Sequence, residues 1–308
     1  MSARPTKRGW ADGAVVPVLV VLAVLMVIWY AAAVWLNAPA QIDRYGRDGL
    51  AAWSQTQLIA DTLSQERPKL PGPHQIVAEL WNTVFGYAPT SNRSMLYHAW
   101  ITFSATGLGF VIGTALGIAL AVLIVHNRAT NHSLMPWVIA SQTIPILAIA
   151  PMIVVIAFNL FTGQLGLDPN AGRLVSKALI SAYLAFFPVT VGMVKGLRSP
   201  EAIQLDLMRT YSANPWQTFW KLRWPAAMPY LFASMKVGVA ASLIGTIVGE
   251  LPTGANGGIG ARLLAGSYYG QTIQIWAALF AASILAAALV GAVGIAQRAV
   301  DARMGVRP

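Results

Sequence analysis

The sequence predicts an all-α polytopic membrane protein with six transmembrane helices and both termini in the cytoplasm. Of its 308 residues, 56% are hydrophobic and only 10% are charged, and the mean hydropathy is +0.58. The apolar residues form long runs that are almost free of charge, as a membrane-spanning helix requires. Basic residues gather in the segments that this topology places in the cytoplasm, in agreement with the positive-inside rule.

The chain begins with a short segment, 1–13, that we expect in the cytoplasm, and the first apolar run follows at 14–36. Because Arg4, Lys7 and Arg8 precede this run, it shares one feature with a secretory signal. The run is much longer than a signal's apolar region of about 7–15 residues. The sequence therefore predicts a transmembrane helix that is retained in the mature protein.

Residues 37–98 are predicted to form a periplasmic segment with short helices. A segment of this length without secondary structure would be unusual in a plain loop. Two stretches, 50–65 and 74–85, have helical spacing of their apolar residues, and the prolines between them break the pattern. We expect both stretches to be short helices over the outer face of the membrane.

Residues 99–297 are predicted to form a core of five further transmembrane helices. Their apolar runs lie at 99–125, 134–160, 174–194, 229–249 and 273–297. In the first of these runs, glycines recur every fourth residue at Gly109, Gly113 and Gly117. This spacing indicates either close contact with a neighbouring helix or the general tolerance of membrane helices for glycine.

The distribution of charge predicts the orientation of the spans. The four segments assigned to the cytoplasm carry twelve basic and four acidic side chains, a net charge of +8 out of +10 for the whole chain; they are 1–13, 126–133, 195–228 and 298–308. Lys177 and Lys236 supply the remainder. Lys177 is expected to extend to the interface from its helix end, while Lys236 either does the same or lines an inner cavity.

Several kinds of chemistry are absent from the sequence. It has no cysteine, its four histidines lack a metal-binding spacing, and it contains neither GxxxxGK[ST] nor GxSxG. The glycine cluster TGANGGIGARL (253–263) is predicted to be a hinge or a flexible outer loop. The span centres also lack Asp, Glu and His, which proton- or ion-coupled transporters usually carry. The energy source for any transport is therefore expected outside this chain.

The segment 195–228 interrupts the apolar pattern with two predicted short helices. Ser199, Pro200 and Glu201 form the start signal of the first. Asn214 and Gln217 form a capping box at the start of the second, and Pro225 is expected to end it. One face of the second helix is aromatic, which is typical of a helix resting on a membrane; it contains Trp216, Phe219, Trp220 and Trp224.

DLMRTYSANPWQTFWKLRWP (206–225) resembles the EAA motif of ABC-importer permeases, E-A-A-x3-G-x9-I-x-L-P. Asp206 aligns with the glutamate and Ser212 with the glycine, whereas Pro225 is identical. From about residue 70 to 297 the chain is similar to the nitrate/taurine/sulfonate-type branch of this binding-protein-dependent transport inner-membrane component family. The similarity is carried by LPGPHQIVAELW (70–81), by the glycine-rich second span, by IPILAIAPMIVV (144–155), by FFPVTVGMVKGL (186–197) and by 224–250.

The resemblance implies the type I ABC-importer permease architecture in the bacterial inner membrane. It implies a permease subunit for a small solute, either a nitrate-, sulfonate- or taurine-like anion or a pyrimidine- or thiamine-precursor-like compound. Expected partners are a second permease chain, most simply forming a homodimer, two copies of a cytoplasmic P-loop ATPase, a periplasmic solute-binding protein and membrane lipid, but no nucleic acid. The chain is expected to be no enzyme and to hold no cofactor, because ATP binds to the ATPase.

The same resemblance assigns candidate site residues. The segment 195–228 becomes an EAA-type coupling loop, and the residues expected to dock the ATPase are Glu201, Asp206, Leu207, Met208, Arg209, Ser212 and Ala213. Residues expected along the translocation path are Pro145, Pro151, Phe187, Pro188, Lys236 and Glu250. Glu250 is interpreted either as a gate residue or as an ordinary interfacial charge. Two alternative functions are a stand-alone secondary transporter or channel, and a membrane enzyme.

Overall fold

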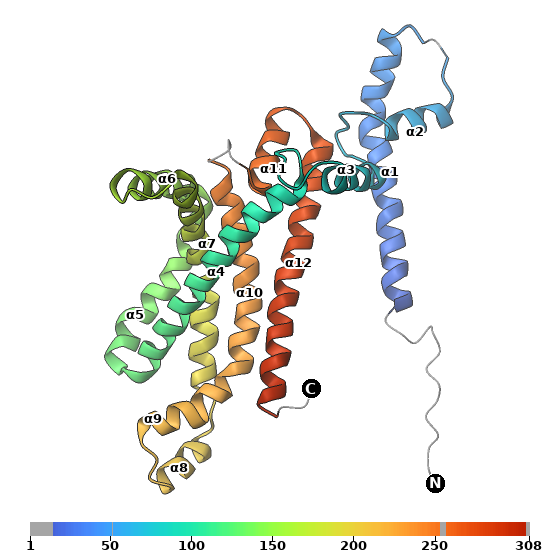
Figure 1. Cartoon of the computed structure of the whole chain (residues 1–308). Helices are drawn as coiled ribbons and strands as arrows, with labels where there is room; N and C mark the ends of the chain where they lie inside the picture. Colours follow the sequence, from blue (N-terminus) through green and yellow to red (C-terminus); the bar gives the residue numbers. More distant parts are fainter. Residues whose placement is uncertain (1–14, 51, 253–256, 306–308) are drawn as a thin grey trace, which may run out of the picture. The chain divides into compact units, whose positions relative to one another are not determined.

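The computed structural model describes residues 15–50, 52–252 and 257–305, which contain helices and no strand (Figure 1). The chain divides into two compact units. The first contains residues 265–277 together with α1 (Val15–Arg47), α2 (Gln55–Leu63) and α3 (Pro73–Phe85). The second runs from residue 87 to 264 and from 278 onward; its helices are α4 (Met95–His126), α5 (Arg128–Ala140), α6 (Ile146–Asn159), α7 (Pro169–Leu197), α8 (Ala202–Thr210), α9 (Pro215–Thr218) and α10 (Trp224–Glu250), with most of α11 (Ile259–Tyr268) and α12 (Thr272–Arg303).

Five helical stretches of the described chain are long and apolar enough to cross a membrane. They are α1, α4, α7, the continuous stretch Pro215–Glu250, and α12. The third predicted span, 134–160, is not one straight helix, because Arg128–Thr143 and Ala148–Gln164 meet at 109°. The break lies at Pro145, which forces the preceding residue away from helical geometry, and Ile144 is extended with ψ of 122°. Counting the bent pair as one span brings the number to six.

In the first unit, α1 continues beyond the predicted run 14–36 as far as Arg47. Asn37, which is only 1% exposed, holds the returning chain against it. Its Oδ1 accepts hydrogen bonds from the backbone N–H groups of Lys69 (2.6 Å) and Leu70 (3.2 Å), and its Nδ2 donates to the Leu70 carbonyl (2.7 Å). A single buried amide thus fixes the approach to α3.

The glycine stripe of α4 faces α7. Gly109, Gly113 and Gly117 are all buried, and a Cβ at Gly113 would lie 2.6 Å from the Ala182 carbonyl oxygen. Side chains at these positions would push the two helices apart, so small residues are needed for close backbone approach. This confirms the first of the two interpretations of the glycine spacing.

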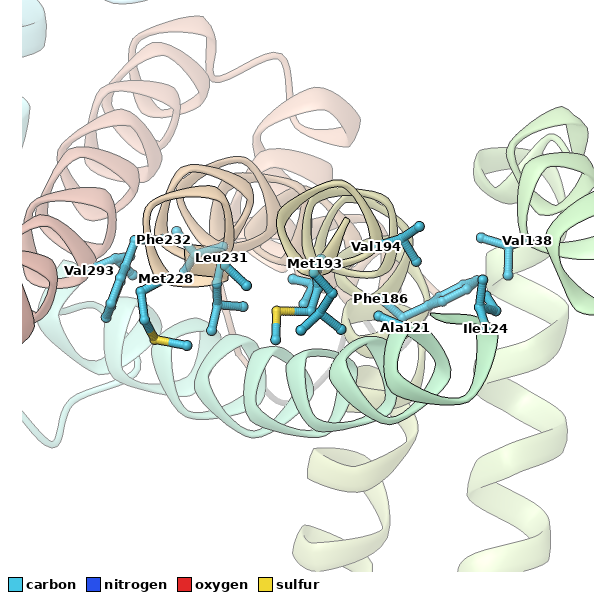
Figure 2. Close-up of a cluster of buried hydrophobic side chains, with 14 of the residues drawn as sticks. Ala121, Ile124, Val138, Phe186, Met193, Val194, Met228, Leu231, Phe232 and Val293 are labelled. Atoms are coloured by element: carbon cyan, nitrogen blue, oxygen red, sulfur yellow. The ribbon is translucent and has the colours of Figure 1, made fainter. Parts of the chain in front are cut away.

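The main apolar core lies where α4, α7 and α10 pack against one another (Figure 2). Ala121 and Ile124 come from α4, Met193 and Val194 from α7, and Met228, Leu231 and Phe232 from α10. Val138 of α5 and Val293 of α12 lie at opposite ends of the cluster in this view. The core therefore joins four of the long helices to α5 near the end that carries α8.

The helix that begins at Pro215 does not end at Pro225, contrary to the sequence prediction. It passes through a π-helical turn, Phe219–Arg223, and continues as α10. In this turn the Trp224 N–H donates to the Phe219 carbonyl five residues back. The wider turn changes the hydrogen-bond register just before Pro225, where an α-helix would lose a backbone bond and meet the proline ring.

Candidate functional site

The helix α8 lies in the polar segment between α7 and α10 (Figure 1). Its N-cap is Glu201, whose backbone N–H donates to Gln204 Oε1 at 3.0 Å. The sequence placed this start two residues earlier, with Ser199 as the cap. In the structure the Ser199 hydroxyl instead donates to the Gly196 carbonyl at 2.7 Å and so belongs to the end of α7.

α8 ends in a Schellman motif at Ser212. The Ser212 N–H donates to the Arg209 carbonyl (2.8 Å) and the Ala213 N–H to the Met208 carbonyl (3.0 Å), which is the hydrogen-bond pattern of this motif. Ser212 has a φ of 51° and is the one non-glycine residue of the described chain with positive φ. This is the position where helices usually place glycine, which explains in physical terms why the related motif carries one there.

One face of α8 is apolar and exposed. Ile203, Leu207 and Tyr211 follow one another at four-residue spacing and are 73%, 54% and 76% exposed. Beside them, Arg209 Nη1 and Asp206 Oδ1 form an exposed ion pair at 2.8 Å. These three side chains give a short polar helix an exposed apolar face.

The structure places five of the seven candidate docking residues at the surface of this segment: Glu201, Asp206, Leu207, Arg209 and Ser212. Met208 and Ala213 are partly buried. The capping box predicted for the next helix is confirmed, since Asn214 Oδ1 accepts from the Gln217 N–H at 2.8 Å and Gln217 Oε1 accepts from the Asn214 N–H at 3.0 Å. The segment therefore consists of two short helices joined by a turn.

The base of this segment is tied to the long helices. The buried ring of Phe219 lies 5.0 Å from the ring of His126 at the end of α4. Arg198 Nη2 donates to Asn131 Oδ1 of α5 at 2.9 Å, and Arg223 Nη1 to the Leu197 carbonyl at the end of α7 at 3.4 Å. These contacts therefore couple the position of α8 to those of α4, α5, α7 and α10.

A second polar constellation surrounds Glu250, at the opposite end of α10. The Glu250 side chain is fully buried. Its carboxylate accepts from the Thr102 hydroxyl, with oxygen–oxygen distances of 2.9 and 3.0 Å, and from the Gly260 N–H at 2.8 Å. The interpretation of Glu250 as an ordinary interfacial charge is therefore wrong, because burial of a carboxylate away from water requires the partners that surround it here.

Lys177 of α7 is the cationic partner in this cluster. Its Nζ lies 3.8 Å from Glu250 Oε1 and donates to the Gly257 carbonyl at 3.3 Å. The side chain is 5% exposed, so the expectation that it extends to the interface is also wrong. The paired carboxylate and carbonyl stabilise the ammonium inside the protein and remove the need to reach water.

The glycine segment before α11 packs onto Glu250. The predicted hinge or flexible loop lies partly in 253–256, outside the described residues, but Gly257 and Gly258 have φ of 99° and 119°. The Gly258 N–H donates to His98 Nδ1 at 3.0 Å, and a Cβ at Gly258 would overlap the Glu250 carboxylate. The described half of the loop is thus held in place by the cluster.

Sequence reasoning missed this cluster, although a signal was present. Polar residues recur every fourth position on three different helices: His98, Thr102 and Thr106 on α4, Lys177 and Ser181 on α7, and Ser242, Thr246 and Glu250 on α10. The stripes meet in the structure, where Thr106 Oγ1 donates to Thr246 Oγ1 at 3.0 Å and Ser181 hydrogen-bonds Ser242. They form a continuous polar seam between the helices.

The residues predicted along a translocation path lie in different surroundings. Pro145 precedes α6 and Pro151 lies within it, whereas α7 is continuous through Pro188. Phe187 packs against the main apolar core. The Lys236 side chain is partly buried and its stem lies against Gly294 of α12. Glu250 belongs to the cluster described above.

Comparison with known proteins shows what the chain is similar to. Residues 113–306 match the family described as "Binding-protein-dependent transport system inner membrane component". A probable ABC transporter permease protein of Haemophilus influenzae is 28% identical over 72% of this chain and 82% of its own length. The formylaminopyrimidine transport permease protein ThiX of Halalkalibacterium halodurans is 31% identical (62% and 68%), and the putative aliphatic sulfonates transport permease protein SsuC of Bacillus subtilis is 28% identical (59% and 61%).

Proposed function

The chain belongs to the family of binding-protein-dependent transport system inner membrane components, and on that premise we propose that it imports one small solute in an ATP-dependent complex. Members are ABC transporter permeases, so the chain is a multi-pass protein of the inner membrane and its family is one of transport rather than of enzymes. The finer points proposed here are the way it couples to an ATPase, its topology, its oligomeric state and its solute.

The observation that carries the coupling proposal is the exposed apolar face of α8. In this proposal Ile203, Leu207 and Tyr211 enter a groove of a separate cytoplasmic ATPase, and the Asp206–Arg209 pair lies at the polar rim. Exposed apolar side chains on a short helix are the anchors that a helix-in-groove interface uses. The ring contact and hydrogen bonds at the base of the segment would transmit an ATP-driven movement of α8 to α4, α5 and α7. The continuous helical stretch Pro215–Glu250 would transmit it to α10.

The topology proposed here depends on the proposed docking of α8. If α8 faces a cytoplasmic ATPase, the end of α7 at Leu197 is cytoplasmic and the end at Pro169 is periplasmic. If the bent α5–α6 pair is one span, there are six spans, and this orientation would put both termini in the cytoplasm. The excess of basic residues in the segments so assigned supports this orientation.

Six spans form half of a translocation path, so we propose a dimer of two such chains, most simply a homodimer, each chain carrying one ATPase. A periplasmic solute-binding protein would deliver the solute to the outer end. ATP-driven closure of the ATPases would shift the dimer between two packings, one open to each side. Pro145, Pro151, Phe187, Pro188, Lys236 and Glu250 remain the candidates for residues along or near the path.

Relatives in the family are named for solutes of two classes. The printed names of relatives include a formylaminopyrimidine permease and an aliphatic sulfonates permease. The chain is therefore proposed to import either a small anion such as nitrate, taurine or a sulfonate, or a pyrimidine- or thiamine-precursor-like compound.

The test is co-expression of the full chain with a candidate P-loop ATPase from the same organism, followed by purification and by uptake in vesicles supplied with a candidate solute-binding protein. The expected result is a stable complex with this P-loop ATPase and uptake that stops when ATP or the ATPase is withheld. Uptake by this chain alone in vesicles without ATP would overturn the proposal in favour of a stand-alone transporter. A chain that neither binds an ATPase nor transports would overturn both.

A further inference from the structure

A cavity of about 330 Å3 lies between the end of α4 and the polar segment that contains α8. Val125 and His126 of α4 line one side of it, and Leu205 and Arg209 of α8 line another. Arg223, the last residue of the π-helical turn before α10, completes the basic part of the lining. We call this space the α8 cavity.

The face of α8 that lines the cavity differs from the face proposed to dock the ATPase. Leu205 and Arg209 are four residues apart and share one side of the helix. The exposed apolar side chains are Ile203, Leu207 and Tyr211. Leu205 is two residues from Ile203 and from Leu207, which corresponds to about 200° of rotation at 3.6 residues per turn. An ATPase on the apolar face would therefore leave the α8 cavity uncovered.

The charges around the α8 cavity leave an excess of one positive charge. Arg209 Nη1 is paired with Asp206 Oδ1 at 2.8 Å, which offsets one of the two guanidinium groups. Arg223 Nη1 donates to the Leu197 carbonyl at 3.4 Å, and no carboxylate among the described residues forms an ion pair with Arg223. Each guanidinium has five N–H donors, so both have donors beyond these contacts. The C-terminal ends of α4 and α8 disfavour an anion, so binding one here requires both arginines.

Neighbouring residues put the α8 cavity at the level of lipid headgroups. α4 is one of the apolar helices long enough to cross a membrane, and the residues that line the cavity, Val125 and His126, are its last two. Trp216 of α9 and Trp220 of the π-helical turn are 69% and 45% exposed, and tryptophan is enriched at the membrane–water interface. The cavity therefore adjoins the place where phospholipid phosphates are concentrated.

The chemistry of the lining favours an anionic phospholipid. Guanidinium groups bind phosphate oxygens with two parallel N–H bonds, and basic pockets between spans on the cytoplasmic side are typical headgroup sites. The segment 195–228 has five basic and two acidic side chains, which attracts anionic lipid to this region. Small-molecule pockets usually have about 300–1,000 Å3, so a cavity of about 330 Å3 suits one headgroup whose acyl chains stay in the bilayer.

We propose that the α8 cavity binds the phosphate of an anionic phospholipid of the cytoplasmic leaflet, between Arg209 and Arg223. This inference rests on the proposed function, because the docking of α8 on a cytoplasmic ATPase assigns the cavity to that leaflet. The bound phosphate links α8 to the π-helical turn, which continues into α10. The lipid thereby fixes the position of α8 relative to the spans, and it is a structural partner of the coupling segment rather than a transported solute.

The test measures the melting temperature of the full chain in nanodiscs, both alone and in complex with the ATPase. Phosphatidylglycerol replaces phosphatidylcholine stepwise, with the acyl chains and the ionic strength held constant. The expected result is a saturable rise of the melting temperature with the fraction of phosphatidylglycerol, with and without the ATPase. Loss of the Arg223 charge should shift this rise to higher fractions of phosphatidylglycerol.

A matched pair of variants makes the result specific. Lys221→Gln removes one positive charge from the same π-helical turn, at an exposed position outside the cavity lining. Arg223→Gln should need at least threefold more phosphatidylglycerol for half of the rise than Lys221→Gln does. If Arg223→Gln does not fold, Arg209→Gln, at an exposed position, replaces it and should show the same difference in the chain without the ATPase.

Four results would overturn the proposal. The first is no saturable effect on the wild type, and the second is an equal shift in the cavity variant and Lys221→Gln, which indicates diffuse attraction to a basic surface. The third is an equal, arginine-dependent stabilisation by inorganic phosphate in phosphatidylcholine nanodiscs, which indicates a soluble ligand. The fourth is a response of the chain alone that disappears in the complex, because the ATPase then occupies the cavity.

The same samples separate this inference from the proposed function. Pull-down of the ATPase reports whether the complex forms, whereas the lipid response of the chain alone does not require the ATPase. A chain that responds to phosphatidylglycerol but binds no ATPase would refute the coupling proposal and, with it, the assignment of the cavity to the coupling segment. A chain that binds the ATPase without any response to phosphatidylglycerol would refute the lipid site alone.

Discussion

Glu250 and Lys177 form an ion pair inside the protein, with Glu250 Oε1 and Lys177 Nζ 3.8 Å apart and side chains that are 0% and 5% exposed. The pair connects α10 to α7, and the hydrogen bond from the Thr102 hydroxyl to Glu250 connects α10 to α4. Removal of one member leaves a buried charge without its counter-ion, which is more costly than the absence of both. The stability of the outer end of the bundle is therefore expected to depend on the two residues together.

Lys177→Met is expected to lower the free energy of unfolding by about 3–5 kcal/mol, as is typical when one partner of a buried ion pair is lost. Thermal melting of the purified chain in detergent measures the effect. The double variant Lys177→Met with Glu250→Gln should be more stable than Lys177→Met alone, because it no longer buries a lone carboxylate. A single variant as stable as wild type would contradict the role of the pair.

Gly258→Ala is expected to detach the glycine segment from Glu250, since the added Cβ would overlap the carboxylate and the residue has φ of 119°. We expect faster hydrogen exchange of the Gly260 amide and a lower melting temperature. Gly270→Ala is the matched control, because it also has positive φ (64°) but no atom within 4 Å of the new Cβ. Equal effects of both substitutions would show that only backbone strain matters.

Ser212→Gly is expected to stabilise the end of α8 by about 1 kcal/mol, the lower limit of the cost of left-handed geometry for an L-residue. Ser212→Val should have the opposite effect, because β-branched side chains tolerate this geometry least. Because α8 is proposed to dock the ATPase, a more stable end of α8 should raise the affinity for the ATPase and a less stable end should lower it. A binding titration measures both changes. Thr210→Gly, at the last residue of α8, serves as the control and should destabilise the helix, because glycine has the lower helix propensity. If glycine weakened binding at both positions, the Schellman geometry would not matter for docking.

Leu207→Asp and Asp206→Arg are expected to weaken the complex with the ATPase at least tenfold, about 1.4 kcal/mol, while membrane insertion is unchanged. Leu207 would lose an apolar anchor, and Asp206→Arg would reverse the charge at the rim. Pull-down of the ATPase measures the loss, and Tyr269→Asp, an exposed apolar position far along the chain from α8, is the control. Unchanged pull-down by Leu207→Asp would refute docking through this face.

Gly113→Ala is expected to destabilise the protein by about 1–3 kcal/mol, because the new methyl group would meet the Ala182 carbonyl oxygen at 2.6 Å. Gly107→Ala, on the same helix, has no atom within 4 Å of the new Cβ and should be neutral or slightly stabilising. The difference between their melting temperatures isolates the α4–α7 contact. A difference near zero would mean that α4 can move away from α7 without loss.

Much of the helical architecture could be predicted, because the physics of single helices is local. The apolar run 99–125 and the Asn214–Gln217 capping box both depend on residues close together in the chain, and both have helical counterparts in the structure. Local rules were less reliable at prolines. Pro225 is accommodated after a π-helical turn instead of ending a helix, since the outcome depends on the hydrogen bonds that neighbouring turns can still form.

The candidate functional residues also differ in whether local sequence could locate them. The segment proposed to dock the ATPase could be located from sequence because it is a polar interruption with its own start signals. The Glu250 cluster could not, because Thr102 and Glu250 are 148 residues apart and meet only through the rotation of three helices about their axes. The four-residue spacing of polar side chains on α4, α7 and α10 was visible, but spacing on one helix does not say which other helix it faces.

By itself, the sequence determined that the chain is all-helical and membrane-embedded and that a polar segment with a turn at Ser212 follows α7. These features follow from hydropathy, periodicity and capping, which act over a few residues. Tertiary structure alone decided that Lys177 and Glu250 are paired in the interior and that the glycines of α4 face α7. Both depend on close packing, which brings together groups that the chain keeps far apart.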